Sequence, residues 1–299
     1  MSAQATPALP SGVRAWVAGA RPRTLPNSIV PVLVGTGCAS AAGAVVWGRA
    51  VLALVVALAL QVGVNYANDY SDGVRGSDTV RVGPLRLTSS GVFAPRAVLL
   101  GACIALGTAC AAGLVLAALT TWWLVVVGAL AVAAAWFYTG GPRPYGYRAM
   151  GDLSVFVFFG LVAVVGTAYV ASVHPGVTAL AVLAAIPCGL LSVSVLVMNN
   201  LRDIPRDAES GKRTLAVVLG DAGTRRLYLG SLAAAAAVTV AVAVLHVAAV
   251  IALLAAPLAV RPVRQVLHGA AGRDLIATLG ETAALQLGFG LLLTAGLFL

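Results

Sequence analysis

The stretch GVNYANDYSDGVRGSD (residues 63–78) carries three carboxylates and two asparagines at the end of a long apolar segment. A charged side chain at the centre of a bilayer costs roughly 2.5–3.5 kcal/mol on insertion scales. Asn65, Asn68, Asp69 and Asp72 follow one another at offsets of three, four and seven residues, so a helix places them on one face. The stretch therefore predicts a helix that crosses a membrane and ends in a polar site.

Oxygen-bearing side chains on one helix face repel one another unless something positive is bound between them. Asp78 follows in a glycine-containing loop and adds another carboxylate. Ligand sets made only of oxygen suit a hard cation such as Mg²⁺ or Ca²⁺. We therefore expect a metal site that includes Asn68, Asp69, Asp72 and Asp78; the alternative is a solvated helix end with capping side chains.

The composition predicts an integral membrane protein. Of its 299 residues, 60% are hydrophobic and 10% charged, and the mean hydropathy is +0.97. A soluble domain carries roughly 25% charged residues. The net charge of +9 fits charge-biased cytoplasmic loops better than a nucleic-acid partner, and we expect no nucleic acid.

Apolar runs of sufficient length divide the chain into nine expected membrane helices. The pattern predicts an all-α, polytopic fold in a single transmembrane domain over residues 1–299, in which residues 1–25 are a cytoplasmic or interfacial segment. The division of 224–262 into two helices rests on His246, where a tight turn would fit. The expected segments are 26–47, 51–72, 96–118, 121–139, 152–173, 177–200, 224–243, 245–262 and 276–299.

The basic residues set the expected orientation. If the N-terminus is cytoplasmic, 18 of the 19 basic residues fall on the inner side and only Arg49 falls outside. This asymmetry is the positive-inside pattern, and we expect a multi-pass protein of the cell (plasma) membrane. It predicts a cytoplasmic N-terminus, an outer C-terminus, and both acidic stretches at the cytoplasmic face.

A second acidic stretch, MNNLRDIPRDAESGKRT (residues 198–214), closes the sixth segment. Asp203 and Asp207 are four residues apart, and Asn199 precedes Asp203 by one turn. Pro205 removes a backbone hydrogen bond, so we expect the helix to kink or end there. Six of the ten acidic residues of the chain lie in the two stretches.

Cations accompany both acidic stretches. Carboxylates that hold divalent metal ions, surrounded by Arg and Lys, suit a diphosphate, because metals bridge carboxylate to phosphate oxygens and Arg binds the remaining oxygens in bidentate fashion. A plain salt-bridge network is the alternative. The expected diphosphate-binding residues are Asn65, Asn68, Arg75, Arg81, Arg86, Asn199, Asn200, Arg202, Lys212 and Arg213.

The loop YTGGPRPYGYR (residues 138–148) lies on the same side. It adds Arg143, Arg148, Tyr145 and Tyr147, and its Gly and Pro residues predict a structured turn. An ordinary interfacial loop is the alternative.

Two Asn/Asp-rich motifs after the second and sixth of nine helices resemble the UbiA-type intramembrane aromatic prenyltransferases. The detailed sequence of the motifs resembles one branch of this family, which prenylates 1,4-dihydroxy-2-naphthoate in menaquinone synthesis. The matching stretches are RPRTLPNSIVPVLVGTG (21–37), NYANDYSDGVRGSDTVRVGPLRLTSSG (65–91), FYTGGPRPYGYRAMGD (137–152) and NNLRDIPRDAESGKRTLAVVLG (199–220).

The resemblance implies a helical bundle around a cavity open to the cytoplasmic side and to lipid. It implies Mg²⁺-dependent transfer of a polyprenyl group from polyprenyl diphosphate to 1,4-dihydroxy-2-naphthoate, with loss of carbon dioxide and formation of demethylmenaquinol. Arg143, Arg148 or Arg202 is expected to orient the carboxylate of the acceptor, and Tyr138 and Tyr145 to face the allylic cation. The implied catalytic residues are Asp69, Asp72, Asp203, Asp207, Arg143 and Tyr145, and the implied metal ligands are Asn68, Asp69, Asp72, Asp78, Asp203 and Asp207.

Other functions remain open on the sequence. A related prenyltransferase could use a hydroxybenzoate, a haem precursor or a lipid alcohol as acceptor. A cation or organic-anion transporter would place ionisable residues near the bilayer midplane, whereas the acids here lie at helix ends. A CDP-alcohol phosphotransferase would need a single dense Asp/Gly/Arg signature, which the sequence lacks.

Overall fold

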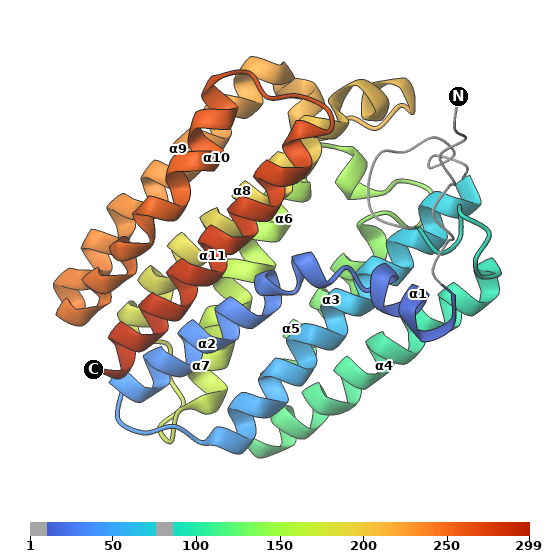
Figure 1. Ribbon diagram of the computed structural model, residues 1–299. Helices are drawn as coiled ribbons and strands as arrows, with labels where there is room; N and C mark the ends of the chain where they lie inside the picture. Colours follow the sequence, from blue (N-terminus) through green and yellow to red (C-terminus); the bar gives the residue numbers. More distant parts are fainter. Residues whose placement is uncertain (1–10, 76–85) are drawn as a thin grey trace.

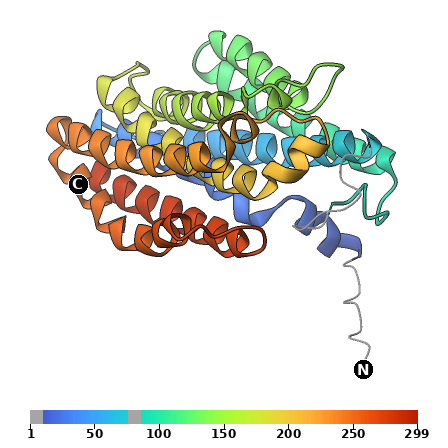
Figure 2. The same cartoon turned by 90° about the horizontal axis from the view of Figure 1, so that it is seen from above.

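The computed structural model describes residues 11–75 and 86–299. These residues form a helical bundle with no strand longer than an isolated bridge. Figures 1 and 2 show α4 and α10 on opposite sides of the bundle. The helices are α1 (Gly12–Gly19), η1 (Pro22–Thr24), α2 (Pro26–Ala41), α3 (Trp47–Arg75), α4 (Pro95–Leu119), α5 (Trp123–Phe137), η2 (Tyr145–Tyr147), α6 (Gly151–Val155), η3 (Phe156–Val162), α7 (Ala163–Ala171), α8 (Ala179–Glu209), α9 (Leu215–Leu245), η4 (Val247–Ala255), α10 (Ala256–Leu267) and α11 (Asp274–Phe298).

Each of the nine apolar segments expected from the sequence contains helix in this part of the chain. Seven continuous helical stretches in the described residues are long and apolar enough to cross a membrane. The other two, α2 and α5, have 16 and 15 residues, or about 24 and 22 Å at 1.5 Å per residue, against a hydrocarbon core of about 30 Å. The protein is therefore an all-helical integral membrane protein with at least seven candidate spans.

The expected division of 224–262 is confirmed, because His246 is extended (φ −149°, ψ 94°) between α9 and η4. Three expected boundaries are wrong. The first apolar segment is helical only to Ala41, and α9 begins at Leu215, nine residues early, with a non-helical Gly220 inside it. The sixth segment remains helical to Glu209, nine residues past its expected end at 200, so of the kink or end expected at Pro205 the end is absent.

Close approaches between helices use small residues, as is common in membrane bundles. Residues 156–162 form a π-helical turn (η3) within the α6–α7 rod. There Gly160 lies against α8, and a β-carbon at Gly160 would stand 2.7 Å from the Cα of Gly189. This contact brings the wall that contains Phe158 and Phe159 close to the helix that carries the second acidic motif.

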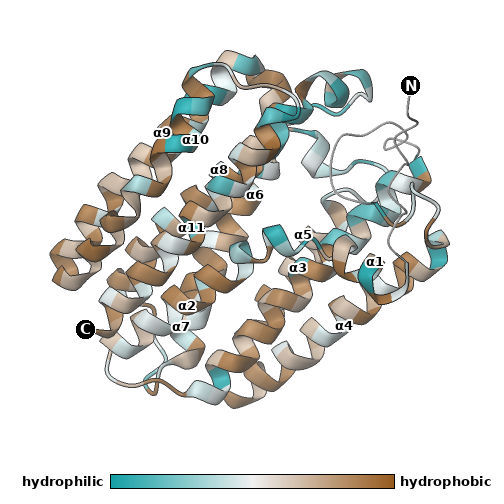
Figure 3. Cartoon of the chain, viewed as in Figure 1, coloured by the Kyte–Doolittle hydropathy of each residue, from teal (hydrophilic) through white to brown (hydrophobic). Residues whose placement is uncertain are grey.

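Hydropathy divides the bundle along its length. Figure 3 shows hydrophobic residues along most of each rod and hydrophilic residues gathered near the ends of α3 and α8, around the loops at the upper end of the view. The C-terminal ends of the two helices lie together, because Lys212, just after α8, contacts Asp72 near the end of α3. The two acidic motifs therefore meet at one end of the molecule.

Candidate active site

One cavity of about 800 Å³ connects the two acidic motifs. Its polar end is bounded by α3, α8 and the loop before η2. Its other walls are mainly apolar and come from α2, α4, α5, η3, α7 and the middle of α8. The polar lining includes Asn65, Asn68, Asp72, Arg86, Tyr138, Thr139, Tyr145, Tyr147, Asn199, Asn200, Arg202, Asp203, Arg206, Asp207 and Lys212. Such a cavity suits a ligand with an anionic head and a hydrocarbon tail.

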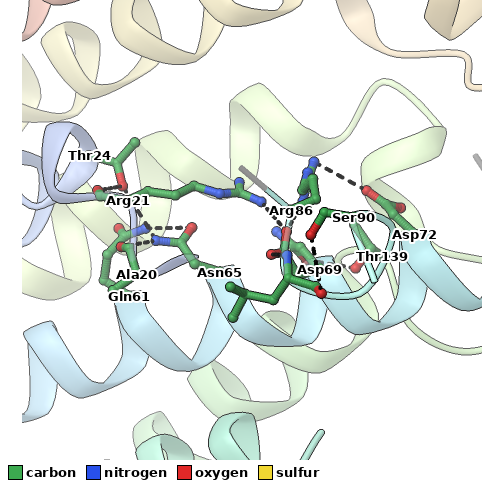
Figure 4. A network of polar contacts seen from close by, with 12 residues as sticks. Ala20, Arg21, Thr24, Gln61, Asn65, Asp69, Asp72, Arg86, Ser90 and Thr139 are labelled. Carbon is green, nitrogen blue, oxygen red and sulfur yellow. Dashed lines mark hydrogen bonds and ion pairs between the residues drawn. The ribbon is translucent and has the colours of Figure 1, made fainter. Parts of the chain in front are cut away.

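Asp69 is held away from this cavity by tight contacts (Figure 4). Arg21 Nη2 and Arg86 Nη1 donate to its Oδ1 at 2.8 and 2.6 Å, and the backbone N of Leu87 donates to Oδ2 at 2.9 Å. Its side chain is fully buried. Asp69 thus connects two segments to α3: the N-terminal segment, through Arg21, and the segment that begins at Arg86, through Arg86 and Leu87.

Asp72, less than one turn further along α3, faces the cavity. The Tyr147 hydroxyl donates to its Oδ1. Lys212 Nζ stands 3.4 Å from the same oxygen, and Arg86 Nη2 stands 3.5 Å from Oδ2. These two ion pairs are longer than the 2.7–3.2 Å of a nitrogen–oxygen hydrogen bond.

The two asparagines of the first motif have different surroundings. Asn68 Oδ1 accepts a hydrogen bond from Thr139 Oγ1 at 2.6 Å at the polar end of the cavity. Asn65 Nδ2 donates to the carbonyl of Ala20 at 2.8 Å and to Thr24 Oγ1 at 3.4 Å. Asn65 therefore fastens the N-terminal segment to α3, although its surface also lines the cavity.

The second motif stays helical, and this keeps Asp203 and Asp207 one turn apart on α8. Arg202 Nε and Nη2 donate to the two oxygens of Asp203 at 2.8 and 2.7 Å, and Nη2 also donates to Asn199 Oδ1 at 2.9 Å. The carbonyl of Asp207 accepts from the backbone N of Lys212 at 2.8 Å. This bond folds the loop after α8 back toward the cavity.

The tyrosines of the 138–148 loop form an aromatic wall. The rings of Tyr138 and Tyr145 meet edge to face with centroids 5.5 Å apart. The Tyr145 hydroxyl donates to the carbonyl of Ala134 at 2.8 Å and lies 2.9 Å from Ser154 Oγ. Burial raises the pKa of Tyr145 above the ordinary value, so this phenol stays protonated at neutral pH.

The expected cations separate into two groups. Arg86, Arg202 and Lys212 line the cavity, whereas Arg75, Arg143, Arg148 and Arg213 are absent from its lining. Arg75 instead donates to the carbonyls of Thr139 and Gly141, and so ties the aromatic loop to the end of α3. Asp78 and Arg81 lie outside the described residues.

The sequence reasoning placed Tyr147 and Arg206 beside the acidic motifs but gave neither of them, nor Arg21, a role in the site. Tyr147 was placed only near the site, yet its hydroxyl reaches Asp72, 75 positions away. Arg21 and Arg206 also line the cavity. Arg21 lies in residues 21–37, one of the stretches that resemble the family, and this resemblance could have pointed to it. Spacing within one helix cannot show contacts between distant segments.

The donor set fits Mg²⁺ on chemical grounds. Among residues 11–75 and 86–299, no three His, Cys, Asp or Glu side chains form a cluster that could hold a metal ion. Instead, single carboxylates and amides from α3 and α8 face a shared cavity. Mg²⁺ is usually bound through one or two carboxylates together with substrate phosphates and water, and not by a protein cage.

The fold and the site define an all-helical integral membrane protein. Its cavity has acidic residues and arginines at one end and mainly apolar walls elsewhere. The UbiA prenyltransferase family matches residues 28–298. The chain belongs to this family.

Named relatives and solved structures agree with that membership. The chain is 53% identical over 282 residues (94% of this chain, 96% of the relative) to a 1,4-dihydroxy-2-naphthoate octaprenyltransferase of Mycobacterium tuberculosis. It is 42% identical to the Escherichia coli enzyme of that name (74% and 75% covered). In fold it resembles the apo UbiA homologue of Aeropyrum pernix (TM-score 0.70, 18% identity, 91% and 96% covered). It also resembles the Archaeoglobus fulgidus homologue bound to GPP and Mg²⁺ (TM-score 0.61, 15% identity, 94% and 99% covered).

Proposed function

We propose that the protein transfers a polyprenyl group from a polyprenyl diphosphate to 1,4-dihydroxy-2-naphthoate, with loss of carbon dioxide, in menaquinone synthesis. One observation carries the proposal: Asp72 of α3 and Asp203 and Asp207 of α8 line a single cavity whose remaining walls are mainly apolar. The names of the relatives that match over most of the chain support this donor and acceptor.

In this proposal the head of the donor lies between α3 and α8. Asn68, Asp72, Asp203 and Asp207 would hold Mg²⁺, which would supply positive charge against the diphosphate leaving group. Arg86, Arg202 and Lys212 bind the remaining phosphate oxygens, for which the planar fork of Arg is suited. Asp69 is left out of this ligand set, because Arg21, Arg86 and Leu87 already occupy both of its oxygens.

The bond between the allylic carbon and the diphosphate oxygen breaks, and the carbon joins the ring position that bears the carboxylate. The electron pair of the ring–carboxylate bond then restores aromaticity as carbon dioxide leaves, so no base is needed for an aromatic proton. The rings of Tyr138 and Tyr145 face the allylic cation, and the apolar walls exclude water that would trap it.

The membrane arrangement follows from the same proposal. Nine spans include the shorter α2 and α5 in one domain. The N-terminus and the acidic motifs face the cytoplasm, and the C-terminus faces outward across the plasma membrane. The distribution of basic residues supports this orientation, and the hydrocarbon tail of the donor can reach lipid between helices.

The test is an assay of the purified protein in nanodiscs with a polyprenyl diphosphate, 1,4-dihydroxy-2-naphthoate and Mg²⁺. The expected result is equal release of carbon dioxide and formation of prenylated naphthoquinol. Hydroxybenzoate serves as the competing acceptor. A preference for hydroxybenzoate would replace the proposed acceptor within the family, and failure with every acceptor would overturn the proposal.

A further inference from the structure

Lys212 is the only lysine of the chain, and it stands beside a metal-ligand candidate. It follows α8 in the loop that leads to α9. Its Nζ lies 3.4 Å from Asp72 Oδ1 and 4.7 Å from the centre of the Tyr147 ring. The ammonium therefore lies next to Asp72 Oδ1, one of the two carboxylate oxygens that are available as metal ligands at this residue.

Tyr147 binds this ammonium against the face of its ring, and this binding position is named the Tyr147 seat. Its hydroxyl donates to Asp72, its ring faces Lys212, and its carbonyl accepts the backbone N–H of Arg213 at 3.1 Å. One residue thus joins the first acidic motif to the loop after the second. A cation over an aromatic face contributes about 0.5–2 kcal/mol, which is enough to hold Lys212 but weak enough to release it.

The contact between Lys212 and Asp72 is suited to exchange. Arg21 and Arg86 bind Asp69 at 2.8 and 2.6 Å, whereas Lys212 and Arg86 approach Asp72 only to 3.4 and 3.5 Å. The ammonium of Lys212 is a compact charge on a flexible stem, unlike the rigid guanidinium fork. Lys212 can therefore turn from Asp72 into the cavity without disturbing the Asp69 network.

We propose that Lys212 is a resident counter-cation that holds the place of a metal ion at Asp72 until a metal–diphosphate complex arrives, and then moves from the Tyr147 seat to the diphosphate. The inference rests on the proposed function and deepens it, because it makes metal binding depend on the presence of the diphosphate.

Metal binding and diphosphate binding then become coupled. A divalent ion alone must displace Lys212 and leave its charge without a partner, so it binds weakly. When diphosphate is present, its oxygens receive the displaced ammonium. The factor by which diphosphate strengthens metal binding must equal the factor by which metal strengthens diphosphate binding.

The single lysine permits direct observation of the exchange by NMR. Protein labelled with ¹³Cε-lysine in nanodiscs gives one side-chain signal, which the Tyr147 ring should shift upfield. The inference predicts that Mg²⁺ alone leaves this shift in place, whereas Mg²⁺ with farnesyl thiodiphosphate, which resists ionisation, removes it. A signal unmoved by the complex, or moved as far by Mg²⁺ alone, would overturn the inference.

Metal titrations give a second readout that does not depend on turnover. In Lys212→Met, removal of a like charge a few ångströms from the site should tighten Mn²⁺ binding without diphosphate by at least about threefold. The same change should reduce the strengthening of Mn²⁺ binding by farnesyl thiodiphosphate by about tenfold. Arg226→Met removes an exposed charge outside the cavity lining and should change neither value. Unchanged or weaker Mn²⁺ binding in Lys212→Met would contradict the placeholder role.

Two substitutions separate the seat from the hydroxyl. Tyr147→Phe keeps the ring under Lys212 and should retain the upfield lysine signal, while Tyr147→Leu should lose it. An upfield signal that survives in Tyr147→Leu would count against the seat.

Failure of the inference is distinguishable from failure of the proposed function. If Mg²⁺ with farnesyl thiodiphosphate raises the thermal stability of the protein while Lys212 stays at Tyr147, only the exchange is wrong. If the complex has no effect on stability at any concentration up to millimolar, the diphosphate site itself is wrong, and the exchange is overturned with it.

Discussion

Asp69 and Asp72 are three residues apart in one motif, yet the structure predicts opposite consequences when each becomes asparagine. Asp69 is fully buried and accepts three short hydrogen bonds. Removing one partner of a buried ion pair costs about 3–5 kcal/mol. Because the amide keeps one acceptor oxygen, we expect the lower end, about 3 kcal/mol, for Asp69→Asn.

Asp72→Asn should affect stability less and turnover more. Its ion pairs are long, and the amide oxygen can still accept from Tyr147, so the cost is about 1 kcal/mol, within the range for one net hydrogen bond. Loss of the carboxylate at the proposed metal position should lower kcat by at least about a hundredfold, the scale of one removed electrostatic group in an active site.

Both variants are assayed by thermal unfolding in one detergent and by turnover of the folded fraction. At roughly 2–4 °C per kcal/mol, Asp69→Asn should lower Tm by about 6–12 °C and Asp72→Asn by about 2–4 °C. Asp69→Asn that unfolds like the wild type but has lost turnover would refute the reasoning, since Asp69 would then be a metal ligand, as its spacing in the sequence first indicated.

Three further results follow from the same contacts. Arg75→Met should lower turnover by about tenfold through loss of its bonds to the aromatic loop, a misplacement effect, and restored turnover in Arg75→Lys would argue against a bidentate anchor. Gly160→Ala should destabilise the protein by about 1–3 kcal/mol, because the added β-carbon overpacks against Gly189. Gly107→Ala is the control and should not destabilise it, since a β-carbon there meets no atom within 4 Å. If Gly160→Ala unfolds at the same temperature as Gly107→Ala, the clash is excluded. Burial raises the pKa of Tyr147 above its usual value near 10, so its contribution to stability is full below pH 10 and declines at higher pH; Tyr147→Phe should show a smaller alkaline loss in pH-dependent unfolding, and an identical alkaline limb would contradict the shift.

The sequence predicted the helical segments well and their ends less well. Hydropathy located the break at His246 because a polar residue interrupts an apolar run there. The helix end that proline chemistry offered at Pro205, as the alternative to a kink, is absent, because α8 continues to Glu209. Ile204, next to that proline, packs against the cluster that contains Met198 and Leu201. This tertiary packing overrides the tendency of the residue before a proline to leave the helical conformation.

The candidate site shows the same limit. Offsets along α3 grouped the polar residues on one broad face, but at 100° per residue Asp69 lies about 60° around the helix from Asp72. That angle turns Asp69 toward Arg21 and Arg86 and leaves Asp72 in the cavity. Periodicity within a helix cannot reveal which side of a face another segment covers. The role of Tyr147 depends on a contact across 75 positions and was hidden for the same reason.

Anomalous diffraction from crystals grown with Mn²⁺ and farnesyl thiodiphosphate would place the metal ions directly. The account predicts peaks between α3 and α8, with oxygens of Asp72 and of Asp203 or Asp207 at the coordination distance of about 2.1 Å, and the diphosphate bridging them. A peak bound to Asp69, or ions held by one helix while the other acidic motif lies apart from the diphosphate, would contradict it.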